Sequence, residues 1–146
     1  MWFKKPADIW ATATGEEASL PIIYRYRQNR PRRAKPEILP TALRVLWAFD
    51  GSKNNGMPEA ADNDAQVRFE DAIEPLTEGP SSFLMLVRTG NSWKEWLFYT
   101  ESAEGWAATL TKLLVGHPPY PLEISNWHDE PWSTWQQFAG GVTGGS

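Results

Sequence analysis

The residue types best suited to acid–base or metal chemistry stand together in the C-terminal part of the chain, as His128, Asp129 and Glu130. An imidazole and two carboxylates can bind a metal ion or transfer a proton. Adjacent side chains rarely converge on one ion, however, and the other histidine, His117, follows an expected helix. We therefore expect no metal and no cofactor, and we keep a small-molecule or hydrolytic site near His128, Asp129 and Glu130 as an alternative function.

A row of acidic residues, Glu70, Asp71 and Glu74, is a second arrangement that could act in catalysis. Glu70 and Glu74 share a face of an expected helix, and that face lies away from the apolar stripe, so we interpret the row as solvent-exposed. The chain also has no cysteine, no Gly-x-Ser-x-Gly elbow, no phosphate loop and no dinucleotide fingerprint. The sequence thus predicts no catalytic residues and favours a protein that is not an enzyme.

Positive charge is concentrated in residues 25–35, which contain six basic residues and no acidic one. Residues 1–44 carry nine Lys or Arg against four Asp or Glu, whereas residues 45–146 carry five against fourteen. Such an asymmetry marks either a surface for nucleic acid or an acidic partner, or a solvated loop. Because the acidic remainder would repel phosphate, we expect no nucleic acid partner, and RNA binding through Arg25–Lys35 stays an alternative.

The chain contains nine tryptophans, of which Trp132 and Trp135 lie three residues apart in a short aromatic segment. These two side chains either pack that segment over a sheet or anchor a partner, because Trp, Tyr and Arg dominate the hot spots of protein interfaces. The residues that could bind a partner are Arg25, Arg27, Arg30, Arg32, Arg33, Trp132 and Trp135.

The basic residues depend on a β-hairpin and a linker that we expect over residues 8–40. Strands at Ile9–Thr14 and Leu20–Arg27 flank an expected turn at Gly15-Glu16-Glu17. The arginines of the second strand alternate with tyrosines, so charged and aromatic side chains point to opposite faces. Three prolines then interrupt regular structure up to residue 40.

From residue 43 the pattern predicts strand, helix, strand, strand, helix, strand. This order is the plan of a ferredoxin-like βαββαβ core over residues 43–126, an α+β fold with two helices on one face of an antiparallel sheet. The expected elements are strands at Leu43–Phe49, Ser82–Thr89, Trp93–Thr100 and Pro121–Ser125, a helix from about Asp62 that ends near Pro75, and a helix capped by Thr100 or Ser102 that runs to Leu114.

The length of 146 residues, with 41% hydrophobic residues, fits a single domain, which we place at residues 1–139. An aromatic segment at 127–139, with a short helix at Pro131–Phe138, ends this domain, and residues 140–146 are expected to be a flexible tail. Several core strands are apolar on both sides, whereas a sheet open to water on one face alternates cleanly. The second face of the sheet is therefore covered by the hairpin, by the C-terminal segment or by another subunit.

Several short motifs in residues 20–136 resemble the bacterial domain-of-unknown-function 695 family. The motifs are Gly56-Met57-Pro58, Glu70-Asp71, Glu95-Trp96-Leu97-Phe98-Tyr99-Thr100, Pro121-Leu122-Glu123-Ile124, and Asp129 with Pro131-Trp132. Two departures are Glu130, which separates Asp129 from Pro131, and Pro75, which interrupts the helix. The plan is also similar to that of the B-type regulators of ribonuclease E activity, small acidic proteins that inhibit a nuclease by binding it; this is a likeness of fold, which does not fix function.

Together these observations lead us to expect a regulatory or interaction domain that acts by binding another protein or a second copy of itself. An immunity-type role and a nuclease-regulating role both fit this expectation. The first six residues lack the apolar stretch of a signal peptide, and no run of 18 apolar residues occurs. We therefore expect a cytoplasmic protein that does not enter a membrane.

Overall fold

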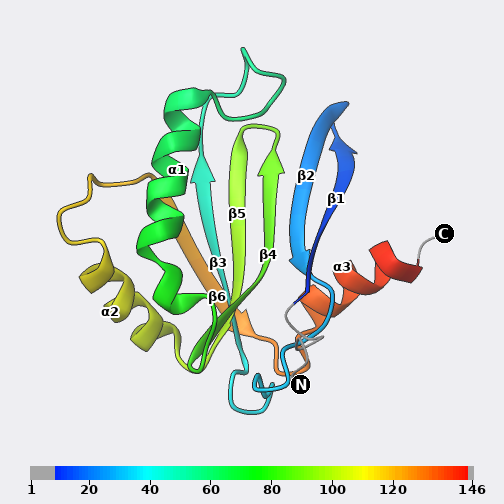
Figure 1. The fold of residues 1–146 in the computed structure, drawn as a ribbon, viewed down its shortest axis with the longest axis vertical. Coiled ribbons are helices and arrows are strands. Elements are labelled where there is room, and N and C mark those ends of the chain that lie inside the picture. The colour runs from blue at the N-terminus through cyan, green and yellow to red at the C-terminus, as the bar shows by residue number, and fades with distance from the viewer. Residues whose placement is uncertain (1–8, 145–146) are drawn as a thin grey trace, which may run out of the picture.

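A six-stranded antiparallel sheet with helices on both faces forms the fold, in the strand order β1–β2–β4–β5–β3–β6 (Figure 1). The computed structural model describes residues 9–144, so the N-terminal residues used to predict the location lie outside the described residues. The strands are β1 Trp10–Glu17, β2 Leu20–Arg27, β3 Thr41–Ala48, β4 Ser82–Gly90, β5 Trp93–Thr100 and β6 Leu122–His128; the helices are α1 Ala60–Ala72, the 3-10 turn η2 Glu74–Leu76, α2 Ala103–Leu113 and α3 Ser133–Gly144. The predicted α+β class is confirmed.

Helices α1 and α2 cover one face of the sheet because alternate residues of β3 and β5 point toward them. Trp96 of β5 packs against Phe69 of α1, with ring centroids 5.0 Å apart, and Phe98 packs at the same separation against Trp106 of α2. Ser102 caps α2 by accepting a hydrogen bond from the Gly105 N–H at 3.1 Å. This face holds one of two hydrophobic clusters.

The second face of the sheet is covered by α3 and by the segment between β2 and β3. Tyr99 and Leu97 of β5 alternate with the residues that face α1, and they contact this second cluster. The C-terminal segment, one of the three expected covers, therefore shares this face with the segment between β2 and β3. None of the helices in the described part of the chain is long and apolar enough to cross a membrane.

The N-terminal hairpin enlarges the sheet to six strands, which corrects the four strands expected for the core, and it places β1 and β2 at the β4 end of the strand order. β2 pairs with β4 in antiparallel register, from Ile22 opposite Gly90 to Tyr26 opposite Leu86, so the hairpin lies beside the core strands. The turn of the hairpin is also elsewhere than predicted. Gly15 continues in β1, and Ala18 and Ser19 make the turn with φ of 52° and 65°.

The C-terminal helix is longer than the expected helix at Pro131–Phe138. α3 begins at Ser133 and continues through residues 140–144, which corrects the prediction of a flexible tail at those positions. Residues 145 and 146 lie outside the described residues. Within the described part of α3, Ala139 is the last residue that is buried in the second cluster, and residues 140–142 are exposed.

Candidate functional site

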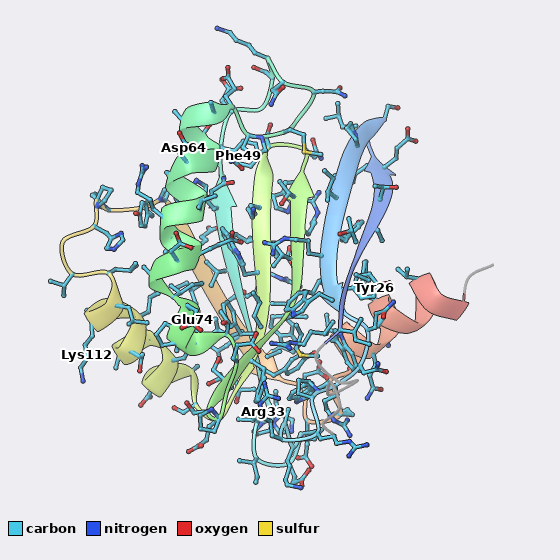
Figure 2. All side chains as sticks on the ribbon, viewed as in Figure 1. Tyr26, Arg33, Phe49, Asp64, Glu74 and Lys112 are labelled. Carbon is cyan, nitrogen blue, oxygen red and sulfur yellow. The ribbon has the colours of Figure 1, made fainter. Side chains whose placement is uncertain are left out.

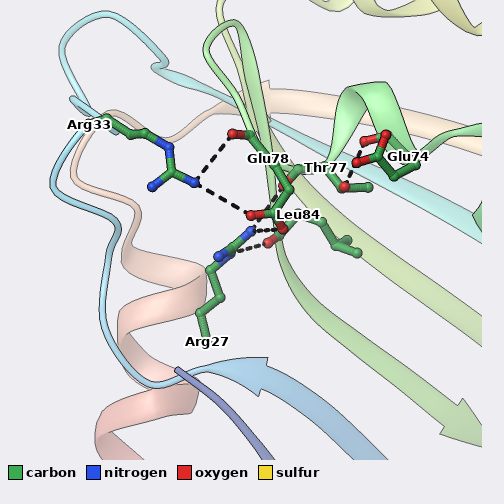
Figure 3. Close-up of polar contacts among 6 residues, drawn as sticks. All are labelled: Arg27, Arg33, Glu74, Thr77, Glu78 and Leu84. Carbon is green, nitrogen blue, oxygen red and sulfur yellow. Dashed lines mark hydrogen bonds and ion pairs between the residues drawn. The ribbon is translucent and has the colours of Figure 1, made fainter. Parts of the chain in front are cut away.

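Arg27 is fully buried although it belongs to the basic segment 25–35. Its Nε donates a hydrogen bond to the Leu84 carbonyl oxygen at 2.8 Å, and its Nη2 donates to the Thr77 carbonyl at 3.0 Å and to Glu78 Oε2 at 2.6 Å (Figure 3). The guanidinium lies 4.8 Å from the centroid of the Trp10 ring. Arg27 therefore joins β2 to the connection between η2 and β4, and the structure places it inside the fold instead of on a partner surface.

Arg25 and Arg33 are also engaged within the chain, but at its surface. Arg25 forms an ion pair with Glu70 at 2.7 Å, and its side chain stays 47% exposed. Arg33 lies 3.5 Å from Glu78 Oε1, on the other side of the carboxylate that binds Arg27, and above the Phe83 ring at 5.2 Å (Figure 3). Glu78 thus links β2 with the segment that follows it.

Arg30, Arg32 and Lys35 differ from the other three basic residues of the segment. They are exposed, and within residues 9–144 their side chains have no recorded hydrogen bond or ion pair. All three belong to residues 28–40, which we name the basic loop. A cavity of about 250 Å³ opens beside the loop and is lined by Arg33, Lys35, Ile38, Leu39 and Pro80, with Ile38 53% exposed. The loop thus combines three cations without an ion pair, beside one exposed carboxylate, Glu37, with an accessible apolar side chain.

Trp132 and Trp135, predicted as possible partner anchors, hold the two ends of the basic loop in place. Trp132 is fully buried and donates a hydrogen bond from Nε1 to the Leu39 carbonyl at 2.8 Å. Trp135 donates from Nε1 to the Arg27 carbonyl at 2.9 Å. Trp132 also stacks on Tyr99 with ring centroids 4.4 Å apart. Both side chains pack α3 onto the sheet, so of the two predicted roles the structure gives them the packing role.

Asp129 caps the first turn of α3 and lies within the fold. Tyr99 Oη donates to Asp129 Oδ2 at 2.7 Å, the Ser133 hydroxyl and N–H donate to Oδ1 at 2.6 and 3.0 Å, and the Thr134 N–H donates to Oδ2 at 3.1 Å. Burial disfavours the charged form of this carboxylate and so acts to raise its pKa. The four hydrogen bonds favour the charged form more strongly and hold the pKa of Asp129 at about 2. Burial and the hydrogen bond to Asp129 raise the pKa of Tyr99.

His128 and Glu130 are exposed to solvent, whereas Asp129 is buried. The predicted site of His128, Asp129 and Glu130 is therefore not assembled. The side chains of His128 and Glu130 are 72% and 54% exposed, with Nε2 and Oε1 3.8 Å apart. Across the described part of the chain, no three His, Asp or Glu side chains are grouped as metal ligands. Asp129 instead stabilises α3.

The hydrogen bonds of Asp129 should make stability depend on acid pH. Because the pKa is lower in the folded protein than its ordinary value of 3.8, this stabilisation is full above about pH 4 and is lost as the pH falls through about 2. We expect a loss of about 2 kcal/mol in the free energy of unfolding between pH 5 and pH 2 that Asp129→Asn does not show. Urea unfolding of both proteins across this range measures the difference. Equal pH profiles for the two proteins would contradict the assignment.

Glu70 lies in a cleft beside α1, which corrects its interpretation as a solvent-exposed residue. Its Oε2 accepts hydrogen bonds from Trp96 Nε1 at 2.8 Å and from Arg25 Nη2 at 2.7 Å, and Lys94 Nζ lies 3.8 Å away. Burial lowers the pKa of Lys94, and the charge of Glu70 opposes that effect. The row was misread because Glu70 lies at the edge of the apolar stripe, beside the buried Phe69.

The cleft encloses about 280 Å³ between α1 and the hairpin and is lined by Trp10, Arg25, Glu70, Glu78, Leu84 and Trp96. Both carboxylates in it are already bound to arginines. Asp71 and Glu74, the other members of the acidic row, are exposed as predicted. Figure 2 shows Glu74 at the end of α1, away from Arg33. One signal did point to Glu70: it and Trp96 both belong to the motifs that carry the family resemblance.

The model of a family of unknown function, DUF695, matches residues 8–139. The chain belongs to this family. The DUF695 match begins before β1 and reaches into α3, so it extends the predicted range of 20–136 to the whole hairpin. The Glu70–Trp96 hydrogen bond and the Asp129 cap both lie within the DUF695 region. A comparison with curated proteins gives no match.

Proposed function

We propose that this DUF695 domain is a non-enzymatic regulatory domain whose basic loop binds an acidic segment of another protein. The observation that carries the proposal is that the six basic residues of 25–35 fall into two groups, those paired with carboxylates and those without an ion pair. Arg25 is paired with Glu70, and Arg27 and Arg33 share Glu78, whereas Arg30, Arg32 and Lys35 are exposed without such a partner in the described structure. Three unneutralised cations on one short loop favour an anionic partner.

The shape of the loop supports recognition of a defined segment. The Leu39 carbonyl of the loop accepts the indole N–H of Trp132, the Arg27 carbonyl just before the loop accepts that of Trp135, and Arg33 lies near Glu78, so little order has to be gained on binding. The cavity beside Ile38 and Leu39 can receive an apolar side chain of the partner. Carboxylates beside an apolar anchor are therefore the chemistry that we expect in the bound segment.

A protein partner fits this surface better than a nucleic acid. Residues 45–146 carry a large excess of acidic residues, which repel a long phosphate backbone but leave a short acidic peptide room on the loop. We further propose that β3, α1, β4, β5, α2 and β6 correspond to a ferredoxin-like core with the hairpin added at one edge; the neighbouring order β4–β5–β3–β6 supports this. The cytoplasmic location expected from the N-terminal sequence belongs to the same proposal.

The test compares two triple variants with equal changes in net charge. Arg30→Ser, Arg32→Ser and Lys35→Ser remove the free charges of the basic loop, and Lys53→Ser, Arg68→Ser and Lys112→Ser remove three exposed charges elsewhere. The partner is isolated by affinity capture from cells that carry the gene and is then titrated against each purified protein. We expect the loop variant to bind about 30-fold more weakly, from roughly 0.7 kcal/mol per charge, and the control variant to bind as the unaltered protein does.

Equal binding by the loop variant and the control would contradict the role of the loop. A single-stranded RNA oligonucleotide serves as a second probe at low and high salt. RNA that binds more tightly than the captured protein, with an affinity that falls steeply with salt, would overturn the proposal in favour of nucleic acid recognition.

A further inference from the structure

The strand β6 forms one edge of the sheet. It pairs with β3 in unbroken antiparallel register, from Leu122 opposite Trp47 to His128 opposite Thr41. Along residues 123–128, the described structure has no backbone hydrogen bond to any element other than β3, and the next N–H, that of Asp129, donates to the Pro40 carbonyl at 2.8 Å. Residues 123–126 are exposed, and Ile124 is 42% exposed. Figure 1 shows β6 at the end of the sheet that lies farthest from the hairpin.

This edge has few of the features by which monomeric proteins usually protect an edge strand. Such strands carry charged side chains, especially lysine, a proline or a bulge, or they are covered by another element. Residues 122–128 contain one carboxylate, Glu123, but no lysine and no proline, and their register with β3 has no shift. A regular edge of seven residues is a template for another strand.

We propose that β6 pairs antiparallel with β6 of a second copy of this chain, across a two-fold axis at Ser125. This register pairs all seven residues, because Leu122 then faces His128 and Glu123 faces Trp127 of the partner subunit. Ser125 would face its own copy, and a small uncharged side chain is suited to that position. Ile124 would gain cover from Asn126 of the partner subunit.

The charges on the edge are complementary in the same register. The Arg44 guanidinium lies 4.8 Å from the centroid of the Trp127 ring, so Glu123 opposite Trp127 would stand next to Arg44 of the partner subunit. Arg44 already bonds to Glu95 through Nε at 3.0 Å, but a guanidinium has five N–H donors and its side chain is 36% exposed. Cross-strand pairs of opposite charge favour this pairing of β6 with itself.

The first experiment measures mass in solution by light scattering and sedimentation over a roughly hundredfold range of concentration, because a dimer of this kind follows mass action. We expect the unaltered protein to dimerise and Ser125→Lys, which places two ammonium groups at the axis, to be monomeric. Thr12→Lys is the matched control, since Thr12 is an exposed residue of β1, the opposite edge strand, and this variant should dimerise normally. Circular dichroism verifies that each variant is folded.

The second experiment tests the register without depending on the lysine variant. The chain has no cysteine, so Ser125→Cys introduces a single thiol. Across a two-fold axis between antiparallel strands the Cβ atoms of directly opposite residues lie about 5 Å apart, close enough for a disulfide after a small adjustment. An added oxidant then removes two electrons and two protons from the two thiols, and we expect a covalent dimer from Ser125→Cys and none from Thr12→Cys.

Three results would overturn the proposal: a protein that is monomeric at every concentration, a dimer that Ser125→Lys leaves intact, or cross-linking of Thr12→Cys in preference to Ser125→Cys. The proposal does not depend on the basic loop. The triple loop variant should therefore dimerise normally, so failure of one proposal is distinguishable from failure of the other.

Discussion

Replacing the buried Arg27 with methionine is expected to lower the free energy of unfolding by about 3 kcal/mol. The substitution fills much of the volume but leaves the Leu84 carbonyl oxygen without its side-chain donor inside the fold, whereas the Thr77 carbonyl oxygen keeps the Leu84 N–H at 3.0 Å. An unsatisfied buried acceptor costs roughly 1–3 kcal/mol, and the lost hydrogen bond from the charged guanidinium to Thr77 adds to that cost. Glu78 is 48% exposed and becomes hydrated in the variant, so the loss of its ion pair with Arg27 adds little. Unfolding by urea, followed by circular dichroism, measures the change.

Arg25→Met is the control for this prediction, because Arg25 lies two residues away on the same strand and face. Its ion pair with Glu70 is at the surface, and such pairs contribute under about 1 kcal/mol. If the two substitutions destabilised the protein equally, the hydrogen bonds of Arg27 would not be the cause. A surface role for Arg27 in binding would instead give a stable variant with altered affinity for its partner.

Trp132→Ala is expected to destabilise the protein by about 4 kcal/mol, the range observed when a large buried aromatic side chain is removed. The substitution removes the stack on Tyr99 and the hydrogen bond to the Leu39 carbonyl, and it leaves a cavity beneath α3. Trp132→Phe keeps a ring against Tyr99 and loses the N–H donor, so it should cost about 1–2 kcal/mol. Chemical unfolding ranks the two variants.

If Trp132→Phe lowered the free energy of unfolding more than Trp132→Ala, the ring would not be packed as described. Trp132 also has a φ of 58°, an unfavourable region for a residue with a side chain, and the chain tolerates it because the ring is fully buried there. We therefore expect the alanine variant to loosen the basic loop as well, which amide hydrogen exchange at Ala34 and Leu39 would detect as lost protection.

Features set by neighbouring residues were predicted well from the sequence. The expected strand at Trp93–Thr100 has the same bounds as β5, and the period of two in any strand puts Leu97 and Tyr99 on the face opposite Trp96 and Phe98. Ser102 was one of two expected caps for α2, and it is the cap in the structure. The Ala18-Ser19 turn was missed because neither residue is a glycine or asparagine, the usual signals of a tight hairpin turn.

The candidate site could be predicted only in part, because the burial and pairing of its residues depend on residues far away in the chain. The basic segment was identified, and the pattern placed Arg25 and Arg27 on one face of β2. Which of them is buried depends on the carbonyl of Leu84, 57 residues further on, and no local pattern carries that information. The same holds for Glu70, whose exposure depends on the position of Trp96 beneath α1.

The contacts of the basic loop also set when during synthesis the loop can take its final shape. The indole groups that bind its flanking carbonyls, at Leu39 and Arg27, lie 93 and 108 residues later in the chain. At ribosomal rates of about 5–20 residues per second, the loop emerges roughly 5–20 s before Trp132 and Trp135 do. A nascent chain therefore exposes Arg30, Arg32 and Lys35 before it can hold the loop in place, and the proposed binding surface is complete only after α3 has left the ribosome.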